Sequence, residues 1–531
     1  MPSRRVLSTL CRRLLPLLVA AVPAAAQAQD EVARTVQQWF ERTRRQVPGD
    51  WGIAVADQAG RVLWEHQAGK PLTPASTVKL FTTGYARSVV GPDGRLPTRV
   101  VGSGFADPES GRWVGDWSLE LNGDFSLESS REAGPTLRDL AIQLASAGVR
   151  ELRGPLRVTS ARGAADARYP AAWSPKHRGR WFAPVVGPLT VHENVIVVTV
   201  SPGRKAGARA LLYGTAPSGL APLVKVTATT RTGRRARLSL RQDRHGGWIV
   251  AGTIGLSGGA RSLRVNTNDP KVVLEAAWAA ALRDAGIRWV TEPLSTIGDI
   301  EPAAPRVLAQ VLSPPFDSLA SIVNRRSMNL GAELLLQWAG GPEDAPRKLT
   351  QHVREVTGAG DGVRLVDGSG LSYDDRATAG AFVAYLAKFP ARKEGRNFAY
   401  LLPANGEGTL RRLRSGLPAP GVVRAKTGTL GHVSAVVGYL GRPEGTLIVS
   451  LLYNGPRTWS ARQAQWRLFR ELGAQGTIIE GDAEAEQEMP LGGDEPAGAD
   501  NTRIDLPVPS LPVPALPAPK PVLVPPRSPQ P

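Results

Sequence analysis

The pattern of apolar and polar residues changes twice along the chain. Residues 31–45 carry apolar side chains at helical spacing and predict an amphipathic helix, with Val32, Val36, Trp39 and Phe40 on one side. Residues 51–56 and 61–65 alternate in character around the turn sequence Asp57-Gln58-Ala59-Gly60, which predicts a β-hairpin. A helix is then expected to begin at Thr73-Pro74, with Thr73 as its cap.

Between about residues 92 and 270, short alternating segments separated by glycine and proline predict a β-rich region. Examples are 191–200 and 225–240, and one predicted helix over 136–147 interrupts them. Helical periodicity then returns, together with three apolar segments of strand length. The predicted helices are 271–285, 316–339, 377–389 and 460–472, and the predicted strands are 422–426, 433–440 and 447–453.

The order of these segments predicts an α/β domain in two halves, residues 29–90 and 290–477, with β-rich inserted domains over 91–289. Residues 1–28 combine arginines, an apolar run and Ala26-Gln27-Ala28, which predicts a signal peptide cleaved after Ala28. The run is too short for a stable membrane span. Residues 478–531 are acidic and then rich in proline, which predicts a disordered tail, either a solvated spacer or a peptide that docks to a partner.

Composition excludes several functions. Lys+Arg 65 against Asp+Glu 47 gives a net charge of +18, but the basic residues are scattered and no zinc knuckle, helix-turn-helix or aromatic RNA-binding signature accompanies them. We therefore expect no nucleic-acid partner and favour a carboxylate-rich polymer. The single cysteine, Cys11, lies in the predicted signal peptide, which excludes disulfides and thiol catalysis from the mature chain.

The first candidate motif is Ser76-Thr77-Val78-Lys79. On a helix, positions i and i+3 share a face, so the Lys79 amine can lie beside the Ser76 hydroxyl. A serine needs a base to act as a nucleophile, and lysine serves only when it is neutral. Its pKa must fall by about 3, which corresponds to about 4 kcal/mol, through desolvation and a nearby second cation.

The second motif, Lys426-Thr427-Gly428-Thr429, lies on a predicted strand. Lys426 can supply the second cation, Gly428 leaves room for a substrate backbone, and the hydroxyls of Thr427 and Thr429 suit a terminal carboxylate.

The third motif is Ser327-Met328-Asn329, between predicted helical stretches. It offers a hydroxyl for proton relay and an amide for a substrate carbonyl. Each short motif has a structural alternative: a core-facing helix residue for Ser76, a helix cap for Asn329 and a surface lysine for Lys426. The order of the three motifs favours catalysis.

In this order the motifs resemble those of the penicillin-binding proteins and serine β-lactamases. More narrowly, the chain resembles the low-molecular-mass class C penicillin-binding proteins, the D-alanyl-D-alanine carboxypeptidases/endopeptidases, from residue 51 to residue 453. The long separation of Lys79 from Ser327 is typical of this group. Further shared signatures are Asn122-Gly123-Asp124, Asn329-Leu330-Gly331-Ala332-Glu333, Asp367-Gly368-Ser369-Gly370-Leu371-Ser372 and residues 424–430.

The resemblance implies an α/β (α+β) fold, in which an antiparallel sheet is flanked by helices beside a helical subdomain and β-rich inserted domains. It implies that Ser76 attacks a D-alanyl carbonyl while Lys79 takes its proton. The N–H groups of Ser76 and Thr429 would form the oxyanion hole, and Ser327 and Lys426 would protonate the leaving amine.

The resemblance also implies peptidoglycan stem peptides as substrates, β-lactams as covalent inhibitors, a periplasmic location, and no metal or organic cofactor. Asp124 matches a residue that in some relatives contacts the free amine of the peptide side chain, with turn capping as the alternative. Tyr373 stands where several relatives carry arginine, which leaves side-chain recognition open. A weakly active wall-binding scaffold and a β-lactamase or esterase remain alternative functions, and the oligomeric state is not predicted.

Overall fold

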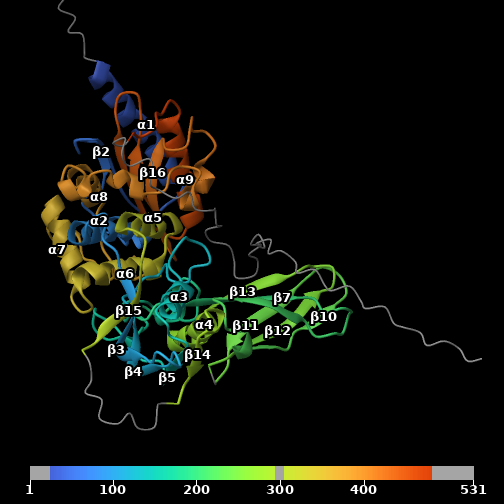
Figure 1. The fold of residues 1–531 in the computed structure, drawn as a ribbon. Helices are drawn as coiled ribbons and strands as arrows, with labels where there is room; N and C mark the ends of the chain where they lie inside the picture. The colour runs from blue at the N-terminus through green and yellow to red at the C-terminus, as the bar shows by residue number, and fades with distance from the viewer. Residues whose placement is uncertain (1–23, 245, 293–303, 481–531) are drawn as a thin grey trace, which may run out of the picture.

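The computed structural model describes residues 24–244, 246–292 and 304–480. Figure 1 shows two parts: a sheet covered by helices, built from both ends of the chain, and a β-rich part built from its middle. The predicted signal peptide lies mostly outside the described residues, and so does nearly all of the predicted tail. Among the described residues, no helix is both long and apolar enough to cross a membrane.

The larger sheet joins the two ends of the chain. Its strand order is β16-β17-β18-β1-β2, and every neighbouring pair is antiparallel. The N-terminal strands form the predicted hairpin, and β1 pairs with β18 from the C-terminal part. The five strands are β1 (Asp50–Asp57), β2 (Val62–His66), β16 (Val423–Leu430), β17 (Val433–Leu440) and β18 (Leu447–Asn454).

Alternation along β1 explains why this sheet is covered on both faces. Trp51, Ile53 and Val55 point to one face, where they pack in a core with α1 (Ala24–Gln46) and α9 (Thr458–Gly473). Ala54 and Ala56 belong to the core on the opposite face, beneath the helical layer. Small residues on that face let the helices approach the sheet closely.

The helical layer over that face contains one helix that the sequence pattern did not predict, α7 (Ala345–Thr357), whose buried residues include Leu349, Val353 and Val356. The helical segment expected over 316–339 is two helices, because Ser327 adopts φ 55 in the left-handed region and ends the first. The remaining helices of the layer are α2 (Val78–Val90), α5 (Phe316–Arg326), α6 (Asn329–Gly340) and α8 (Ala379–Lys388).

The start of α2 differs from the sequence prediction. Thr73 does not cap the helix; its hydroxyl accepts a hydrogen bond from Arg376 at 3.2 Å. A single 3₁₀ turn, Ala75–Thr77, precedes α2, and Ala75 adopts φ 49. A residue in that conformation cannot continue a right-handed helix, so Thr73-Pro74 lies outside it.

The middle of the chain forms small sheets around a separate core. Helix α3 (Leu137–Ser146) is capped by Thr136, which makes a capping box with Asp139, and α4 (Pro270–Asp284) is the second helix there. Strand β15 (Arg306–Leu312) lies beyond residue 289, where the insertion was expected to end, and pairs with β3. The strands before it are β3 (Pro97–Ala106), β4 (Trp113–Glu120), β5 (Glu151–Arg153), β6 (Val158–Thr159), β7 (Val195–Ser201), β8 (Leu211–Ala216), β9 (Val224–Val226), β10 (Thr229–Arg231), β11 (Arg237–Gln242), β12 (Trp248–Gly255), β13 (Arg261–Asn266) and β14 (Arg288–Val290).

Candidate active site

Ser76 lies where the edge strand β16 meets the first turn before α2. The approach is close enough to require glycine at 428: a Cβ there would lie 2.6 Å from the Pro74 carbonyl oxygen and 3.2 Å from the Ser76 nitrogen. Gly428 was predicted to leave room for a substrate backbone; in the fold it also admits the turn that carries Ser76.

Lys79 is fully buried and joins three parts of the site. Its Nζ lies 3.0 Å from Ser76 Oγ, 2.7 Å from Asn329 Oδ1 and 2.6 Å from the Ser369 carbonyl oxygen. The Asn329 side chain in turn donates through Nδ2 to the carbonyl oxygen of Phe182, in the middle part of the chain, at 2.9 Å. The first and third sequence motifs therefore meet at the lysine amine.

Burial lowers the pKa of Lys79 to about 7, and the nearby carboxyl groups of Asp367, Glu333 and Asp375 oppose that shift. Desolvation is thus the main cause, as expected from the sequence. The repulsion from a second cation, which we expected to act on Lys79, instead contributes at Lys426.

Three buried carboxyl groups behind Lys79 were not predicted as site residues. Asp367 accepts backbone N–H bonds from residues 369–372, Glu333 accepts the Gly368 N–H, and Asp375 accepts the Val366 N–H. Burial and the charge of Asp367 raise the pKa of both Glu333 and Asp375. Glu333 and Asp367 lie in segments that carry the family resemblance, which was the available sequence signal.

Lys426 and Ser327 form a second pair. The Lys426 ammonium donates to Ser327 Oγ at 2.9 Å and to the Thr427 carbonyl oxygen at 2.8 Å. Burial lowers the pKa of Lys426 well below its usual range, and the positive charges of Lys79 and Arg462 lower it further. The second and third motifs therefore also meet.

At the far end of the motif on β16, Thr427 is buried and Thr429 is exposed. Arg462 of α9 donates through Nη2 to the Gly428 carbonyl oxygen at 2.7 Å and to Thr429 Oγ1 at 3.3 Å. Sequence reasoning missed Arg462, because nothing local to α9 relates it to a strand more than thirty residues earlier.

Asp124 is buried in the middle part of the chain. Its Oδ1 accepts from the Ser126 N–H at 2.8 Å and from the Ser126 hydroxyl at 2.6 Å, whereas Oδ2 has no hydrogen-bond partner. Burial raises the pKa of this carboxyl to about 6. The turn contacts predicted as the alternative are present, but they use one oxygen only. The neighbouring Phe125 packs against α6, close to Gly331.

Tyr373 lies at the end of β16, its hydroxyl close to Gly431. The Lys176 ammonium lies 4.5 Å from the centre of its ring. A cation is therefore present beside Tyr373.

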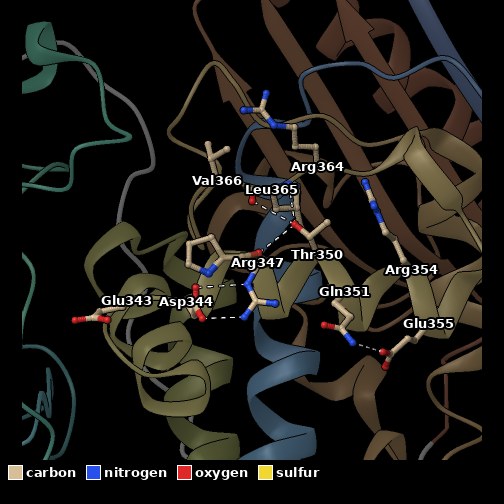
Figure 2. Close-up of a pocket in the computed structure, with 11 residues that line it drawn as sticks. Glu343, Asp344, Arg347, Thr350, Gln351, Arg354, Glu355, Arg364, Leu365 and Val366 are labelled. Atoms are coloured by element: carbon tan, nitrogen blue, oxygen red, sulfur yellow. Dashed lines mark hydrogen bonds and ion pairs between the residues drawn. The ribbon is translucent and has the colours of Figure 1, made fainter.

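A surface groove of about 690 Å³ lies elsewhere, along the outer side of α7 (Figure 2). Two of its charged groups, Arg347 and Asp344, are paired with one another. No predicted site residue lines it. The described residues contain no group of three His, Cys, Asp or Glu side chains arranged to hold a metal ion.

Together, the sheet, the helical layer and a serine beside a buried lysine, faced by a second lysine on the edge strand, define the penicillin-binding protein and serine β-lactamase class. Within that class, the chain belongs to the D-Ala-D-Ala carboxypeptidase 3 (S13) family, whose model matches residues 32–470.

Individual relatives agree with this assignment. The D-alanyl-D-alanine carboxypeptidase of an Actinomadura species is 28% identical over 490 residues, covering 85% of this chain and 87% of that protein. The penicillin-sensitive carboxypeptidase A of Dictyostelium discoideum is 22% identical and covers 69% of this chain and 74% of that protein. Penicillin binding protein 4 of Haemophilus influenzae shares the fold, with a TM-score of 0.64 at 18% identity, over 81% of this chain and 98% of that one.

Proposed function

We propose that this protein is a serine D-alanyl-D-alanine carboxypeptidase/endopeptidase that acts on peptidoglycan stem peptides and cross-links through an acyl-enzyme at Ser76. The observation that carries the proposal is the contact of 3.0 Å between Ser76 Oγ and a buried Lys79 amine whose pKa is about 7. At neutral pH a substantial fraction of that amine is unprotonated and can accept the serine proton.

In the proposed acylation step, Ser76 Oγ forms a bond to the D-alanyl carbonyl carbon while its proton passes to Lys79. The N–H groups of Ser76 and Thr429 would bind the resulting oxyanion. The close approach of Gly428 to the Ser76 nitrogen supports this, since it brings the turn and the strand to one place.

Collapse of the tetrahedral intermediate breaks the C–N bond, and the leaving amine requires a proton. Ser327 is suited to relay to it the proton that Lys79 took from Ser76, because its hydroxyl accepts a hydrogen bond from Lys426 and is thereby oriented. This relay returns Lys79 to its neutral form. Water then attacks the ester carbonyl and gives a proton to Lys79, and Lys79 passes that proton to Ser76 Oγ as the ester bond breaks and the shortened peptide is released.

Two features favour a zwitterionic peptide as the substrate. The hydroxyls of Thr427 and Thr429 suit its terminal carboxylate. The unpartnered Oδ2 of buried Asp124 suits an ammonium group on its side chain, because an ammonium would satisfy that oxygen and compensate its charge. Export by the predicted signal peptide would place the enzyme in the periplasm, where peptidoglycan and β-lactams reach it.

Covalent labelling tests the proposal. Fluorescent penicillin is expected to label the purified protein, and Ser76→Ala is expected to abolish the label. Ser88→Ala is the matched control, since Ser88 lies on α2 but bonds only to the Tyr85 carbonyl oxygen. Labelling that survives in Ser76→Ala would refute the proposed nucleophile. Digestion of muropeptides would then separate loss of terminal D-alanine from cleavage of cross-links, and no product would favour a wall-binding scaffold.

A further inference from the structure

The guanidinium of Arg462 lies behind the exposed end of the β16 motif, and only some of its N–H groups have a hydrogen-bond partner. Its Nη2 donates to the Gly428 carbonyl oxygen and to Thr429 Oγ1, whereas Nη1 is buried and has no hydrogen-bond partner. The face of the group lies over the ring of Trp466, at 5.1 Å. The side chain therefore has a fixed place and spare donor capacity.

Arg462 also lacks a carboxylate partner among the described residues. By contrast, Arg87 pairs with Asp317, and both Arg264 and Arg326 pair with Glu193. Burial lowers the pKa of Arg462 to about 9, so the group is still charged at neutral pH. A largely desolvated charge without a counter-ion is costly, and such a charge beside the candidate active site is expected where the substrate supplies the anion.

The hydrogen bonds of Arg462 orient the Thr429 hydroxyl. Thr429 Oγ1 accepts from Arg462, so the Thr429 hydroxyl proton is free to point away from α9. Thr429 is exposed, and its hydroxyl can therefore donate to an anion in the cleft. An acceptor bound there would complete a series of hydrogen bonds from Arg462 through the Thr429 hydroxyl to the ligand.

We propose that Arg462 positions the Thr429 hydroxyl and supplies positive charge for the terminal carboxylate of the substrate, so that the site selects peptides that end in a free carboxylate. This inference rests on the proposed peptidase function. Arg462 acts through Thr429 and is a positioning residue. If Arg462 only stabilised β16, its loss would slow the reaction of every substrate equally. If it acts on the substrate carboxylate, its loss slows the reaction of peptides with a charged C-terminus more than that of peptides with an uncharged one.

The test compares an acyl-D-alanyl-D-alanine peptide with its C-terminal amide in the full chain. Arg462→Gln is expected to lower the ratio of kcat/KM for the acid to that for the amide by about 10- to 100-fold, the range of one charge-assisted hydrogen bond. Arg462→Lys keeps the charge but not the fork, and an intermediate ratio is expected. Arg467→Gln, an exposed position on the same helix, is expected to leave the ratio unchanged.

Equal losses on both peptides, or an unchanged ratio, would overturn the inference. Acylation by benzylpenicillin and by its methyl ester separates this outcome from failure of the proposed function. If the ester acylates wild type and Arg462→Gln at equal rates while benzylpenicillin reacts about 10- to 100-fold more slowly with the variant, the inference holds. If neither compound acylates the wild-type protein, the peptidase proposal fails and the inference fails with it.

Discussion

Lys79 illustrates how one residue can be tuned by opposing surroundings. Burial lowers its pKa, the three carboxyl groups behind it raise it, and the net value is about 7. Since the base must be neutral, acylation should increase as the pH rises through about 7 and should fall about tenfold per pH unit well below it. The rate constant for acylation by benzylpenicillin between pH 5.5 and 8.5 checks this expectation, and a rate that does not vary over that range would contradict it.

Lys79→Arg serves as the companion variant. An arginine keeps the positive charge but does not release its proton at any of these pH values, so labelling should be lost throughout. The far-ultraviolet circular dichroism of the variant checks that it still folds. Labelling by folded Lys79→Arg would assign the base to another group.

At the scale of a single element, residues 366–375 form the wall that holds Lys79 from behind. The two oxygens of Asp367 accept four backbone N–H bonds, and the resulting loop presents the Ser369 carbonyl oxygen to the lysine. Asp375 accepts the Val366 N–H through one oxygen, and burial and the charge of Asp367 raise the pKa of its carboxyl.

The two aspartates should therefore respond differently to the same substitution. Asp375→Asn keeps an oxygen for the Val366 N–H and removes a carboxyl whose ionised form is disfavoured by burial and by Asp367. It should change the free energy of unfolding by less than about 1 kcal/mol, with acylation retained. Asp367→Asn places an amide NH₂, which cannot accept a hydrogen bond, opposite backbone N–H groups. It should lower the free energy of unfolding by about 3 kcal/mol or more. Urea denaturation at pH 7 measures both costs, and a comparable cost for the two variants would contradict this expectation.

At the scale of the whole molecule, the middle part of the chain is tied to the catalytic helices by a buried ion cluster. Glu193 accepts two hydrogen bonds of 2.8 Å from Arg326, the last residue of α5, and one of 3.1 Å from Arg264. Burial alone would raise the pKa of Glu193, but the charges of Arg326, Arg264 and Arg131 and the hydrogen bonds from Arg326 lower it to about 2. The cluster holds the position from which Ser327 projects.

Glu193→Gln should lower the free energy of unfolding by about 3 to 5 kcal/mol at pH 7, since it removes the negative charge that Arg326 and Arg264 bind in a largely buried cluster, and should slow acylation. A carboxyl whose pKa is lowered on folding stabilises above its ordinary value of 4.5, and this stabilisation is lost as the pH falls toward 2. The difference from wild type should therefore shrink between pH 4.5 and pH 2.

Denaturation curves at pH 7 and pH 3 test this prediction. The exposed pair between Arg44 and Glu41 provides the control, and Glu41→Gln should cost less than about 1 kcal/mol at either pH. If Glu193→Gln lowers the free energy of unfolding by the same amount at both pH values, the charge of Glu193 is not the source of the stabilisation.

The sequence by itself determined the periodic elements and the chemistry of the motifs. Short spacings along the chain predicted the first hairpin and the strands that follow residue 422. The order of the motifs predicted the pairs of Ser76 with Lys79 and of Ser327 with Lys426. Local patterns failed at Thr73-Pro74, where the left-handed Ala75 starts the helix later than its cap signal.

Only the tertiary structure decided what surrounds the reacting groups. The carboxyls behind Lys79, the Phe182 carbonyl that holds Asn329, and Arg462 behind Thr429 come from segments far apart in the chain. Their effect depends on burial, because charges and hydrogen bonds that are weak in water become strong when solvent is excluded. The sequence determines which chemical groups are present, whereas the tertiary structure determines which of them are buried beside one another.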